Sequence, residues 1–413
     1  MIPMNEHFTS EFFAGNRARL RELFSGTAPI VLVANGLLQR GADSTFPFQQ
    51  DATFWYLTGI DEPDVVMVLD KDKEYLIVPR RTGSRATFDG AIDDSALIRR
   101  SGIGTILYED EGWRQLGSRL HKVKHVATLP ASPKYVEQYG MFTNPARGHL
   151  IRKMKAENRD LELLDLSQHL ARMRMIKQSL EISALQNAID ITIDSLKDTL
   201  KPAKRAKYSY EYEIEAELTK NFRVRGGRGH AFEPIVAGGK RACTLHNVSN
   251  NEALSADELL ICDVGAEYSH YAADITRTVA LSSPSRRQET VFEAVLEVQE
   301  YAKSLLKPGV LLKDYEQKVE QYIGEKLRAL GLIKTIDHDN VCKYYPHATS
   351  HFLGLNVHDV GDYDRPLEPG VVLTVEPGIY ISEEAIGVRI EDDALVTEDG
   401  IRILSDRLPR TLA

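Results

Sequence analysis

The chain has 413 residues, of which 43% are hydrophobic and 27% charged, a balance typical of a globular protein that can bury a sizeable core. Lys and Arg total 51 against 60 Asp and Glu, so the formal charge is −9, which argues against nucleic acid as a partner because phosphate binding needs a basic surface. No apolar run approaches the ~20 residues of a membrane span, and three cysteines without CxxC spacing predict neither structural disulfides nor a thiolate zinc site.

The first residues, MIPMNEHFTSEFF, contain neither a basic segment nor a long apolar one, so we expect no signal peptide and a cytoplasmic location. Short apolar runs then alternate with segments of helical spacing. The runs predict strands at 30–34, 65–69, 75–78 and 105–108, and the spacing predicts helices at 11–24, 113–120 and 161–172. This interleaving is typical of an α/β domain.

A basic stretch, RMRMIK at 172–177, leads into a strongly amphipathic segment, and we place a domain boundary there, giving domains 1–172 and 173–413. The second domain has a different pattern. Its apolar stripes predict helices at 211–225, 288–306 and 312–330, and its apolar runs predict strands at 259–264, 273–281, 371–375 and 388–397. Helices and strands do not alternate regularly, which favours the α+β class.

Two acidic residues, Asp263 and Asp274, lie on predicted strands where a core face would favour apolar side chains. If these strands form a hairpin that turns at Tyr268 and Ser269, the two acids are directly opposite, with Cβ atoms ~5 Å apart. Carboxylates this close repel each other unless they are protonated or bridged by cations. A pair of metal ions ~3.5–4 Å apart suits such bridging carboxylates.

A second acidic pair follows the same logic. A turn at Glu383 and Glu384 would place Glu376 opposite Glu391. A single acid in such a position is usually a turn or edge residue, but four acids in two opposed pairs favour a functional site. Because the turns lack the Asn-Gly type that fixes a hairpin, geometry alone leaves the structural and functional interpretations open.

Three histidines, His347, His351 and His358, lie within twelve residues in HATSHFLGLNVHDVG, between the two acidic pairs. Such a cluster favours a metal ligand or a proton-transfer group. Gly354 leaves open whether the segment is a helix or a strand. One imidazole with four carboxylates forms an oxygen-rich donor set that suits Mn²⁺, with Co²⁺, Fe²⁺ and Zn²⁺ as alternatives.

Taken together, four motifs resemble the metallopeptidases of the pita-bread fold: DVGAEYSHYAADITRT, the histidine run, VEPGIYI and GVRIEDD. They are most similar to Xaa-Pro aminopeptidases (aminopeptidase P) and Xaa-Pro dipeptidases (prolidases). ADSTFPFQQDATFWYLTG, at 42–59, resembles the N-terminal domain of aminopeptidase P. The resemblance implies a creatinase-like α/β N-terminal domain and an α+β pita-bread catalytic domain.

The resemblance also implies a ligand set for two divalent metal ions. Asp263 would chelate one ion, while Asp274 and Glu391 would bridge both. His351 and Glu376 would bind the other ion. Glu376 would in addition act as the general base towards a water between the ions.

Further roles follow from the same resemblance. His358 would donate a hydrogen bond to the substrate carbonyl oxygen, and His347 and His246 would contact the substrate. Arg389 would orient Asp274. Each role awaits the geometry of the folded chain.

The implied activity is hydrolysis of the bond between an N-terminal residue and a following proline, by attack of a metal-bridging hydroxide. The substrates would be peptides with proline at the second position, and we expect a homodimer or homotetramer because the family usually assembles. An Xaa-Pro dipeptidase is the main alternative; it would need a basic group such as Arg365, otherwise an exposed loop residue, to bind the carboxylate after proline. A non-catalytic binding module on this fold is disfavoured by the full ligand set.

Two departures from the family pattern concern the substrate side. Ala348 stands where the family often has glycine, and Phe88 is the nearest match to a tryptophan that reaches a neighbouring subunit.

Overall fold

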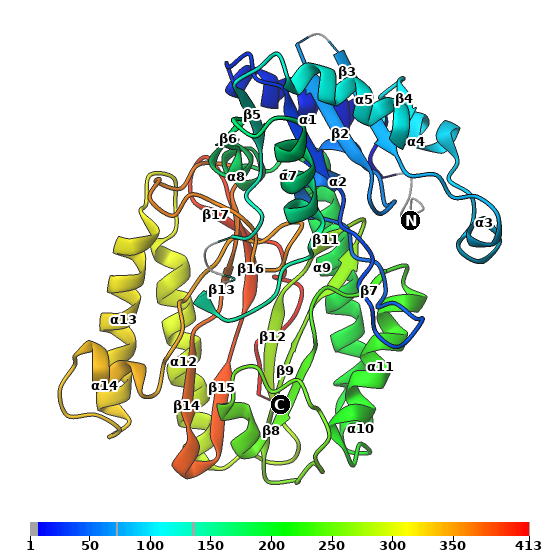
Figure 1. Cartoon of the computed structure of the whole chain (residues 1–413). Coiled ribbons are helices and arrows are strands. Elements are labelled where there is room, and N and C mark those ends of the chain that lie inside the picture. The colour runs from blue at the N-terminus through cyan, green and yellow to red at the C-terminus, as the bar shows by residue number, and fades with distance from the viewer. Residues whose placement is uncertain (1–6, 72, 134–135, 137, 413) are drawn as a thin grey trace. The chain divides into compact units, whose positions relative to one another are not determined.

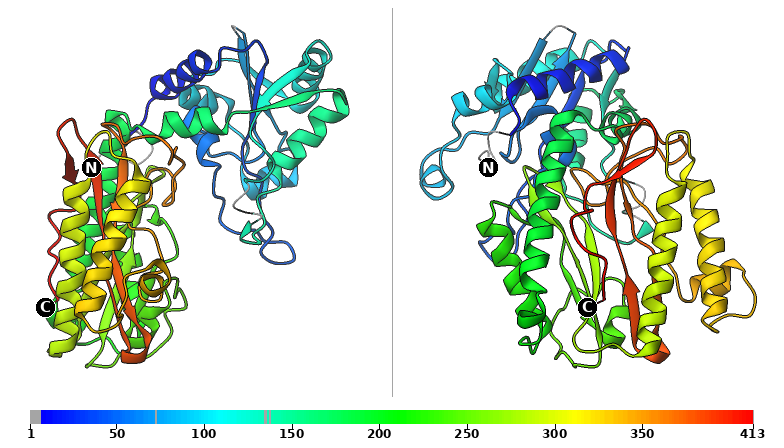
Figure 2. Two further views of the ribbon diagram at one scale, coloured as in Figure 1. Left: turned by 90° about the vertical axis from the view of Figure 1, so that its left-hand side faces the viewer. Right: turned by 180° about the vertical axis from the view of Figure 1, so that it is seen from behind.

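The computed structural model describes residues 7–71, 73–133, 136 and 138–412. The chain divides into two compact units (Figures 1 and 2). One unit is Phe8–Met173, and the other runs from Arg174 to the end of the described chain and also includes His7.

The Phe8–Met173 unit contains a mixed six-stranded sheet in the order β4-β3-β2-β1-β5-β6. The two pairings among β1, β2 and β3 are antiparallel and the other three are parallel. The strands are β1 (Ile30–Val33), β2 (Val66–Asp70), β3 (Lys73–Val78), β4 (Ile106–Tyr108), β5 (His125–Thr128) and β6 (Glu162–Asp165). The described helices are α1 (Ser10–Leu23), α2 (Ala52–Thr58), α3 (Ser84–Asp89), α4 (Asp94–Ser101), α5 (Glu109–Leu120), α7 (Ala146–Glu157) and α8 (Ser167–Met175).

This unit confirms the predicted α/β class. Its core packs Leu116 of α5 and Leu150 of α7 against Val31 and Val68 of the sheet. The predicted helix at 161–172 is wrong in its first half. Residues Glu162–Asp165 form the edge strand β6, which pairs with β5, and the helix α8 begins only at Ser167.

The second unit combines four small sheets with long helices. The sheets are ordered β12-β9-β8, β11-β10-β7, β13-β16-β17 and β14-β15. Their strands are β7 (Gly229–His230), β8 (Ile235–Gly238), β9 (Leu259–Val264), β10 (Ala266–Tyr268), β11 (Tyr271–Ala272), β12 (Ile275–Ala280), β13 (Val372–Val375), β14 (Gly378–Ile381), β15 (Ile386–Arg389), β16 (Asp392–Val396) and β17 (Ile401–Ile403). The α-helices are α9 (Ser179–Thr199), α10 (Pro202–Arg205), α11 (Glu211–Val224), α12 (Arg286–Leu305), α13 (Leu312–Ala329) and α14 (His338–Cys342), and the 3-10 segments are η2 (Gly239–Cys243) and η3 (Ser382–Glu384).

Figure 1 shows the strands of this unit between α9 and α11 on one side and α12 and α13 on the other. An extensive apolar cluster lies where α12 and α13 pack against the strands that follow residue 371. Helix α12 buries Val291, Val295, Val298 and Ala302, whose spacing of three and four residues defines one helix face. Burying a side chain of this kind contributes roughly 1.5–3 kcal/mol to folding, so this face fixes α12 against the sheet.

One predicted strand of this unit is wrong. We expected a continuous strand at 388–397, but β15 ends at Arg389 and β16 begins at Asp392. Ile390 and Glu391 lie in the interruption, and the N–H of Glu391 donates to the carbonyl of Thr276 in a different sheet. The break therefore contains Glu391, one of the predicted metal ligands.

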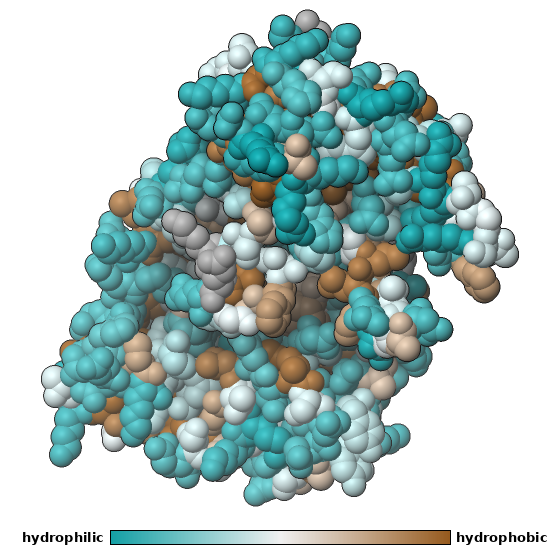
Figure 3. All heavy atoms as spheres, in the orientation of Figure 1, coloured by the Kyte–Doolittle hydropathy of each residue, from teal (hydrophilic) through white to brown (hydrophobic). Residues whose placement is uncertain are grey.

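Polar residues cover most of the face shown in Figure 3, and hydrophobic residues occur there in small groups. Across the described residues, none of the helices combines the length and apolar character that crossing a membrane requires.

Candidate metal centre

Asp263 and Asp274 come together through a hairpin whose register differs from the predicted one. Asp263 pairs with Thr276 across β9 and β12. The turn lies at Ser269 and His270, both with positive φ, one residue beyond the predicted turn. Asp274 is therefore two residues away from the position opposite Asp263. Because side chains alternate with a period of two, this shift keeps both carboxylates on the same face.

The predicted register that places Glu376 opposite Glu391 is confirmed. Val375 pairs with Asp392 on one side of them, and Gly378 pairs with Arg389 on the other. The N–H of Glu376 donates to Thr349 O (2.9 Å) and that of Glu391 to Thr276 O (3.1 Å), so both groups point away from the partner strand. The two glutamates thus form a non-hydrogen-bonded pair, the arrangement in which opposed side chains lie closest.

The histidine-rich segment is neither helix nor strand around His351; a single bridge joins Phe352 to Leu373. Glu316 of α13 holds this loop. Its carboxylate accepts from the N–H of Thr349 (2.9 Å) and of Ser350 (3.2 Å), and from the Thr349 hydroxyl (2.8 Å). No spacing in the sequence connects Glu316 with the histidines, and sequence reasoning missed it.

These elements bring all five predicted ligands together. Asp274, His351 and Glu391 offer ligand atoms that all lie within 4.8 Å of one another. His351 Nε2 is 3.5 Å from Asp274 Oδ2 and 3.2 Å from Glu376 Oε1. Asp263 completes the group, and its buried Oδ1 has no hydrogen-bond partner among the described residues.

The electrostatics of the cluster reflect crowded carboxylates. Burial raises the pKa of Asp274 to about 7, and the charges of Asp263 and Glu376 add to this, whereas a hydrogen bond with His351 acts in the opposite direction. Burial, followed by the charges of Asp274 and Glu376, holds the pKa of Glu391 well above its usual range. A cation among these oxygens would remove the repulsion.

The donor set fits two divalent ions. Four carboxylates and one imidazole form a hard, oxygen-rich environment, and the unpartnered oxygen of Asp263 is free to coordinate. Oxygen-rich donor sets of this kind suit hard divalent ions, whereas sulfur-rich sites select soft metals.

Arg389 occupies a different place from the predicted one. We expected it to orient Asp274, but its Nη2 donates to Asp263 Oδ2 at 2.6 Å. Its other donors bind Tyr380 Oη (2.9 Å) and Thr276 Oγ1 (3.1 Å). The two-residue shift of the hairpin places Thr276 opposite Asp263, and Arg389 reaches both. Sequence reasoning missed Thr276 and Tyr380.

The other histidines surround the cluster. His347 Nε2 lies 2.8 Å from Tyr380 Oη, and its Nδ1 lies 3.9 Å from a carboxylate oxygen of Glu376. Burial lowers the pKa of His347. The ring of His358 meets that of His351 edge to face, with centroids 4.3 Å apart. His246 is exposed and interacts electrostatically with His358, in agreement with a location on the same side of the site.

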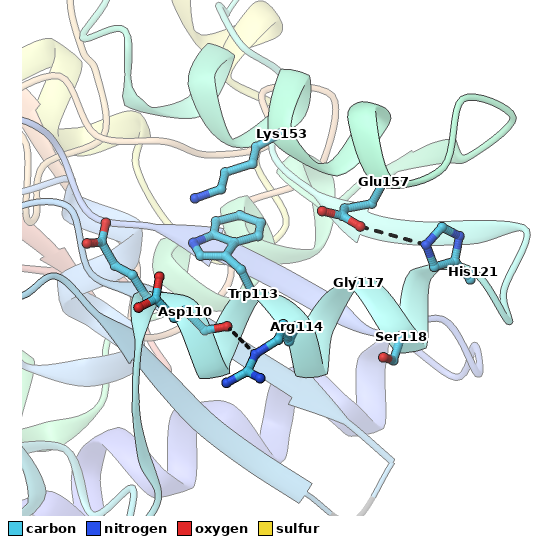
Figure 4. A pocket seen from close by; sticks show the side chains of 9 residues that line it. Asp110, Trp113, Arg114, Gly117, Ser118, His121, Lys153 and Glu157 are labelled. Carbon is cyan, nitrogen blue, oxygen red and sulfur yellow. Dashed lines mark hydrogen bonds and ion pairs between the residues drawn. The ribbon is translucent and has the colours of Figure 1, made fainter.

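A groove of about 670 Å³ lies apart from these residues, on α5 and α7 of the other unit (Figure 4). Lys153 Nζ lies 3.9 Å from the centroid of the Trp113 ring, and His121 pairs with Glu157 at 3.7 Å. Among the described residues, the groove does not bring together a set of metal-ligating side chains like the one around His351. The converging carboxylates, and not this groove, are therefore the candidate site.

Comparisons with known proteins agree with this geometry. Residues 182–398 match metallopeptidase family M24, and residues 13–127 match the N-terminal domain of aminopeptidase P. The chain is 34% identical to the Xaa-Pro aminopeptidase of Haemophilus influenzae, covering 98% of this chain and 96% of that one. It is 33% identical to Xaa-Pro aminopeptidase 3 of Homo sapiens, covering 94% of this chain and 80% of that one.

Solved structures agree as well. The zinc-substituted aminopeptidase P of Escherichia coli in complex with product matches with a TM-score of 0.86 at 28% identity, covering 98% of this chain and 96% of that one. The aminopeptidase PepP of Pseudomonas aeruginosa matches with a TM-score of 0.87 at 28% identity, covering 100% and 97%. All five converging ligands fall within the matched catalytic region. The chain belongs to metallopeptidase family M24.

Proposed function

We propose that this protein is an Xaa-Pro aminopeptidase, a metal-dependent exopeptidase that releases an N-terminal residue preceding proline. The convergence of five metal-ligand side chains in the M24 region is the observation that carries the proposal. Near full-length similarity to Xaa-Pro aminopeptidases supports the substrate class, peptides with proline at the second position.

Asp263, Asp274, His351, Glu376 and Glu391 would hold two divalent ions, Mn²⁺ first and Co²⁺, Fe²⁺ or Zn²⁺ as alternatives. When bound, the ions would supply Lewis acidity at the substrate carbonyl and would lower the pKa of a bound water. Asp274, His351 and Glu391, whose ligand atoms lie within 4.8 Å of one another, would form the centre of this donor set.

Glu376 acts as the general base. In the metal-free protein burial raises the pKa of Glu376, but hydrogen bonding and the charge of His351 outweigh it and lower the pKa to about 2, so the carboxylate is ionised. It accepts the proton of the attacking water at a carboxylate oxygen and delivers a proton to the departing proline nitrogen.

The histidines serve the substrate. His358 donates a ring N–H to the carbonyl oxygen as this oxygen gains negative charge. His347 and His246 position the peptide. Proline has no N–H at the scissile bond, so recognition depends on these side chains and on the shape of the site.

The dipeptidase alternative depends on a free cation that could bind the carboxylate of an Xaa-Pro dipeptide. Arg365 was the candidate, and its Nη2 already lies 3.1 Å from Glu368 in an exposed ion pair. This pairing supports the interpretation of Arg365 as a loop residue and favours the aminopeptidase.

The decisive measurement is kcat/KM, with Mn²⁺ supplied, for an Xaa-Pro dipeptide and for the matching Xaa-Pro-Yaa tripeptide. We expect a strong preference for the tripeptide. Chelator-stripped enzyme and Glu391→Gln serve as inactive controls. A strong dipeptide preference would identify a dipeptidase, and no cleavage of either peptide with any of the four metals would overturn the enzyme proposal.

We further propose that the enzyme acts in the cytoplasm as a homodimer or homotetramer. The three cysteines are free thiols in the structure, which suits a reducing compartment. Exposed aromatic side chains on the Phe8–Met173 unit, Phe88 (86% exposed) and Phe142 (101%), offer apolar contact area for assembly. Light scattering on the purified protein would give the mass; a monomer would contradict the assembly.

A further inference from the structure

The interrupted strands at Glu376 and Glu391 leave a backbone carbonyl without its usual donor. Pro377 lies opposite Ile390, and the N–H of Ile390 donates to Pro377 O at 3.4 Å. The reciprocal bond cannot form because proline has no N–H. Ile390 is fully buried, so an unpaired carbonyl there would be costly.

The side chain of Gln299, on α12, supplies the missing donor. Its Nε2 lies 3.0 Å from Ile390 O, 3.1 Å from Val375 O and 3.2 Å from Asp392 Oδ2. Its Oε1 accepts from Lys303 Nζ and Arg410 Nη1, both at 3.1 Å. The two cations fix the direction of the amide, so its N–H groups face the carbonyls.

The two carbonyls belong to the residues directly before the two glutamates. A peptide group is planar, and it unites the carbonyl of one residue with the N–H of the next. Val375 O and Glu376 N–H are thus the two ends of one plane, and Ile390 O and Glu391 N–H are the ends of another. Gln299 binds the carbonyl end of each plane, while the carbonyls of Thr349 and Thr276 accept from the N–H ends.

We propose that Gln299 is a positioning residue of the metal centre: its amide fixes the peptide groups before Glu376 and Glu391 and so sets the separation of the two carboxylates. The proposal rests on the proposed function, because it takes both glutamates as metal ligands. Gln299 is fully buried, and it reaches the two glutamate segments through their backbone carbonyls.

Gln299→Met tests this role, because methionine keeps the length of the side chain and removes its donors. Mn²⁺ binding to the chelator-stripped protein is measured by titration calorimetry. We expect the affinity to fall about 10- to 100-fold while the circular dichroism spectrum is retained.

Gln288→Met is the matched control. Gln288 lies on the same helix, is 8% exposed and donates to the Asp257 carbonyl at 2.8 Å, away from the ligands. It also completes the cap of α12, so its loss lowers the melting temperature. We expect Mn²⁺ affinity within about twofold of wild type, because a loss of general stability does not by itself change the ligand geometry.

Pro377→Ala in the Gln299→Met background provides a rescue, because alanine restores an N–H opposite Ile390 O. We expect the double variant to bind Mn²⁺ more tightly than Gln299→Met. If Gln299→Met alone is insoluble, the double variant is compared with Pro377→Ala, and the difference between them gives the same information.

The possible results distinguish a failure of the proposed function from a failure of the proposed role of Gln299. Wild-type protein that binds no metal overturns the proposed function. Wild-type protein that binds two ions, together with a folded Gln299→Met variant of equal affinity, overturns only the role of Gln299. If the double variant binds Mn²⁺ no more tightly than Gln299→Met, Gln299 does not act by replacing the N–H that Pro377 lacks.

Discussion

Thr276 connects two sides of the metal centre through one hydroxyl group. Its Oγ1 donates to Glu391 Oε2 at 2.7 Å and accepts from Arg389 Nε at 3.1 Å. Arg389 in turn binds Asp263. A continuous chain of hydrogen bonds therefore runs from Asp263 through Arg389 and Thr276 to Glu391, and so joins two predicted metal ligands.

Thr276→Val keeps the shape of the side chain and breaks this chain. Glu391 loses a donor and Arg389 Nε loses its acceptor, so we expect Mn²⁺ affinity to fall about tenfold. Calorimetric titration of the metal-free protein gives the measurement. Thr58→Val is the control, because the buried Thr58 hydroxyl of the other unit also donates one hydrogen bond, to Phe54 O (2.8 Å), and accepts one, from the Ile60 N–H (3.2 Å). Equal affinities in the two variants would contradict the role of Thr276.

The positions of single residues in the site could be predicted from the sequence only in part. Alternation along a strand is a local property, so the shared face of Asp263 and Asp274 followed from the pattern. The turn did not, because positive φ at Ser269 and His270 has no glycine or asparagine to signal it. Because of this shift in the hairpin register, Arg389 binds Asp263 and not Asp274. The contact joins β15 to β9, which belong to separate sheets, so the local sequence pattern does not reveal it.

At the scale of elements, Gly265 lets β9 continue into β10 past the returning chain. A Cβ at this position would lie 1.7 Å from Ala273 O, a distance at which no side chain fits. Gly265 lies two residues after Asp263, and Ala273 directly precedes Asp274. The close approach of the two backbones therefore helps set the distance between these carboxylates.

We expect Gly265→Ala to force the two segments apart, which lowers the free energy of unfolding by about 1–3 kcal/mol or more and weakens metal binding. Urea unfolding of the metal-free protein measures the first effect. Gly400→Ala controls for the substitution itself, because no atom lies within 4 Å of the added Cβ, and its effect should stay within about 0.5 kcal/mol. Similar stabilities for the two variants would refute the steric argument.

The boundaries of helices and strands could be predicted where the residue pattern is apolar throughout. They could not be predicted where a hydrogen-bond partner distant in the sequence determines them. The predicted strand at 259–264 matches β9, whose six residues are all buried. The predicted strand at 388–397 breaks because the Glu391 N–H turns to Thr276 O, and the predicted helix at 161–172 begins late because β5 offers Glu162–Asp165 a parallel partner. Neither partner is visible in local periodicity.

At the scale of the whole molecule, a buried ion triad links the start of the catalytic unit to the loop that carries His358. Asp359 accepts from Arg174 and from Lys177 Nζ (3.2 Å), and all three side chains are almost fully buried. Gly354 makes room for the triad, since a Cβ there would lie 2.1 Å from Asp359 Oδ2. Removing one member leaves an uncompensated buried charge.

The triad predicts how stability depends on pH. Burial raises the pKa of Asp359, but the charges of Arg174 and Lys177 outweigh it and hold the pKa below its ordinary value. A lowered folded pKa means that the stabilisation is complete above about pH 5 and is lost as the pH falls through ~3.9 towards the folded value.

We therefore expect Asp359→Asn to cost about 3–5 kcal/mol at pH 7, and its difference from wild type to shrink as the pH approaches 3. Urea unfolding at a series of pH values gives both numbers. The exposed Asp364→Asn should track wild type within about 0.5 kcal/mol throughout. A difference for Asp359→Asn that stays constant with pH would contradict the assignment.

The five predicted metal ligands come from three separate parts of the chain, namely two hairpins and the histidine loop. Thr276, Thr349 and Gln299 contact them where separate sheets and helices meet. We therefore expect the complete donor set to form only after the two hairpins and the histidine loop have packed together. On this view the folded protein would bind the divalent ion that is available to it. Since affinities of such sites generally follow the intrinsic order of the divalent metals, cultures rich in zinc and cultures rich in manganese would yield the same polypeptide with different ions.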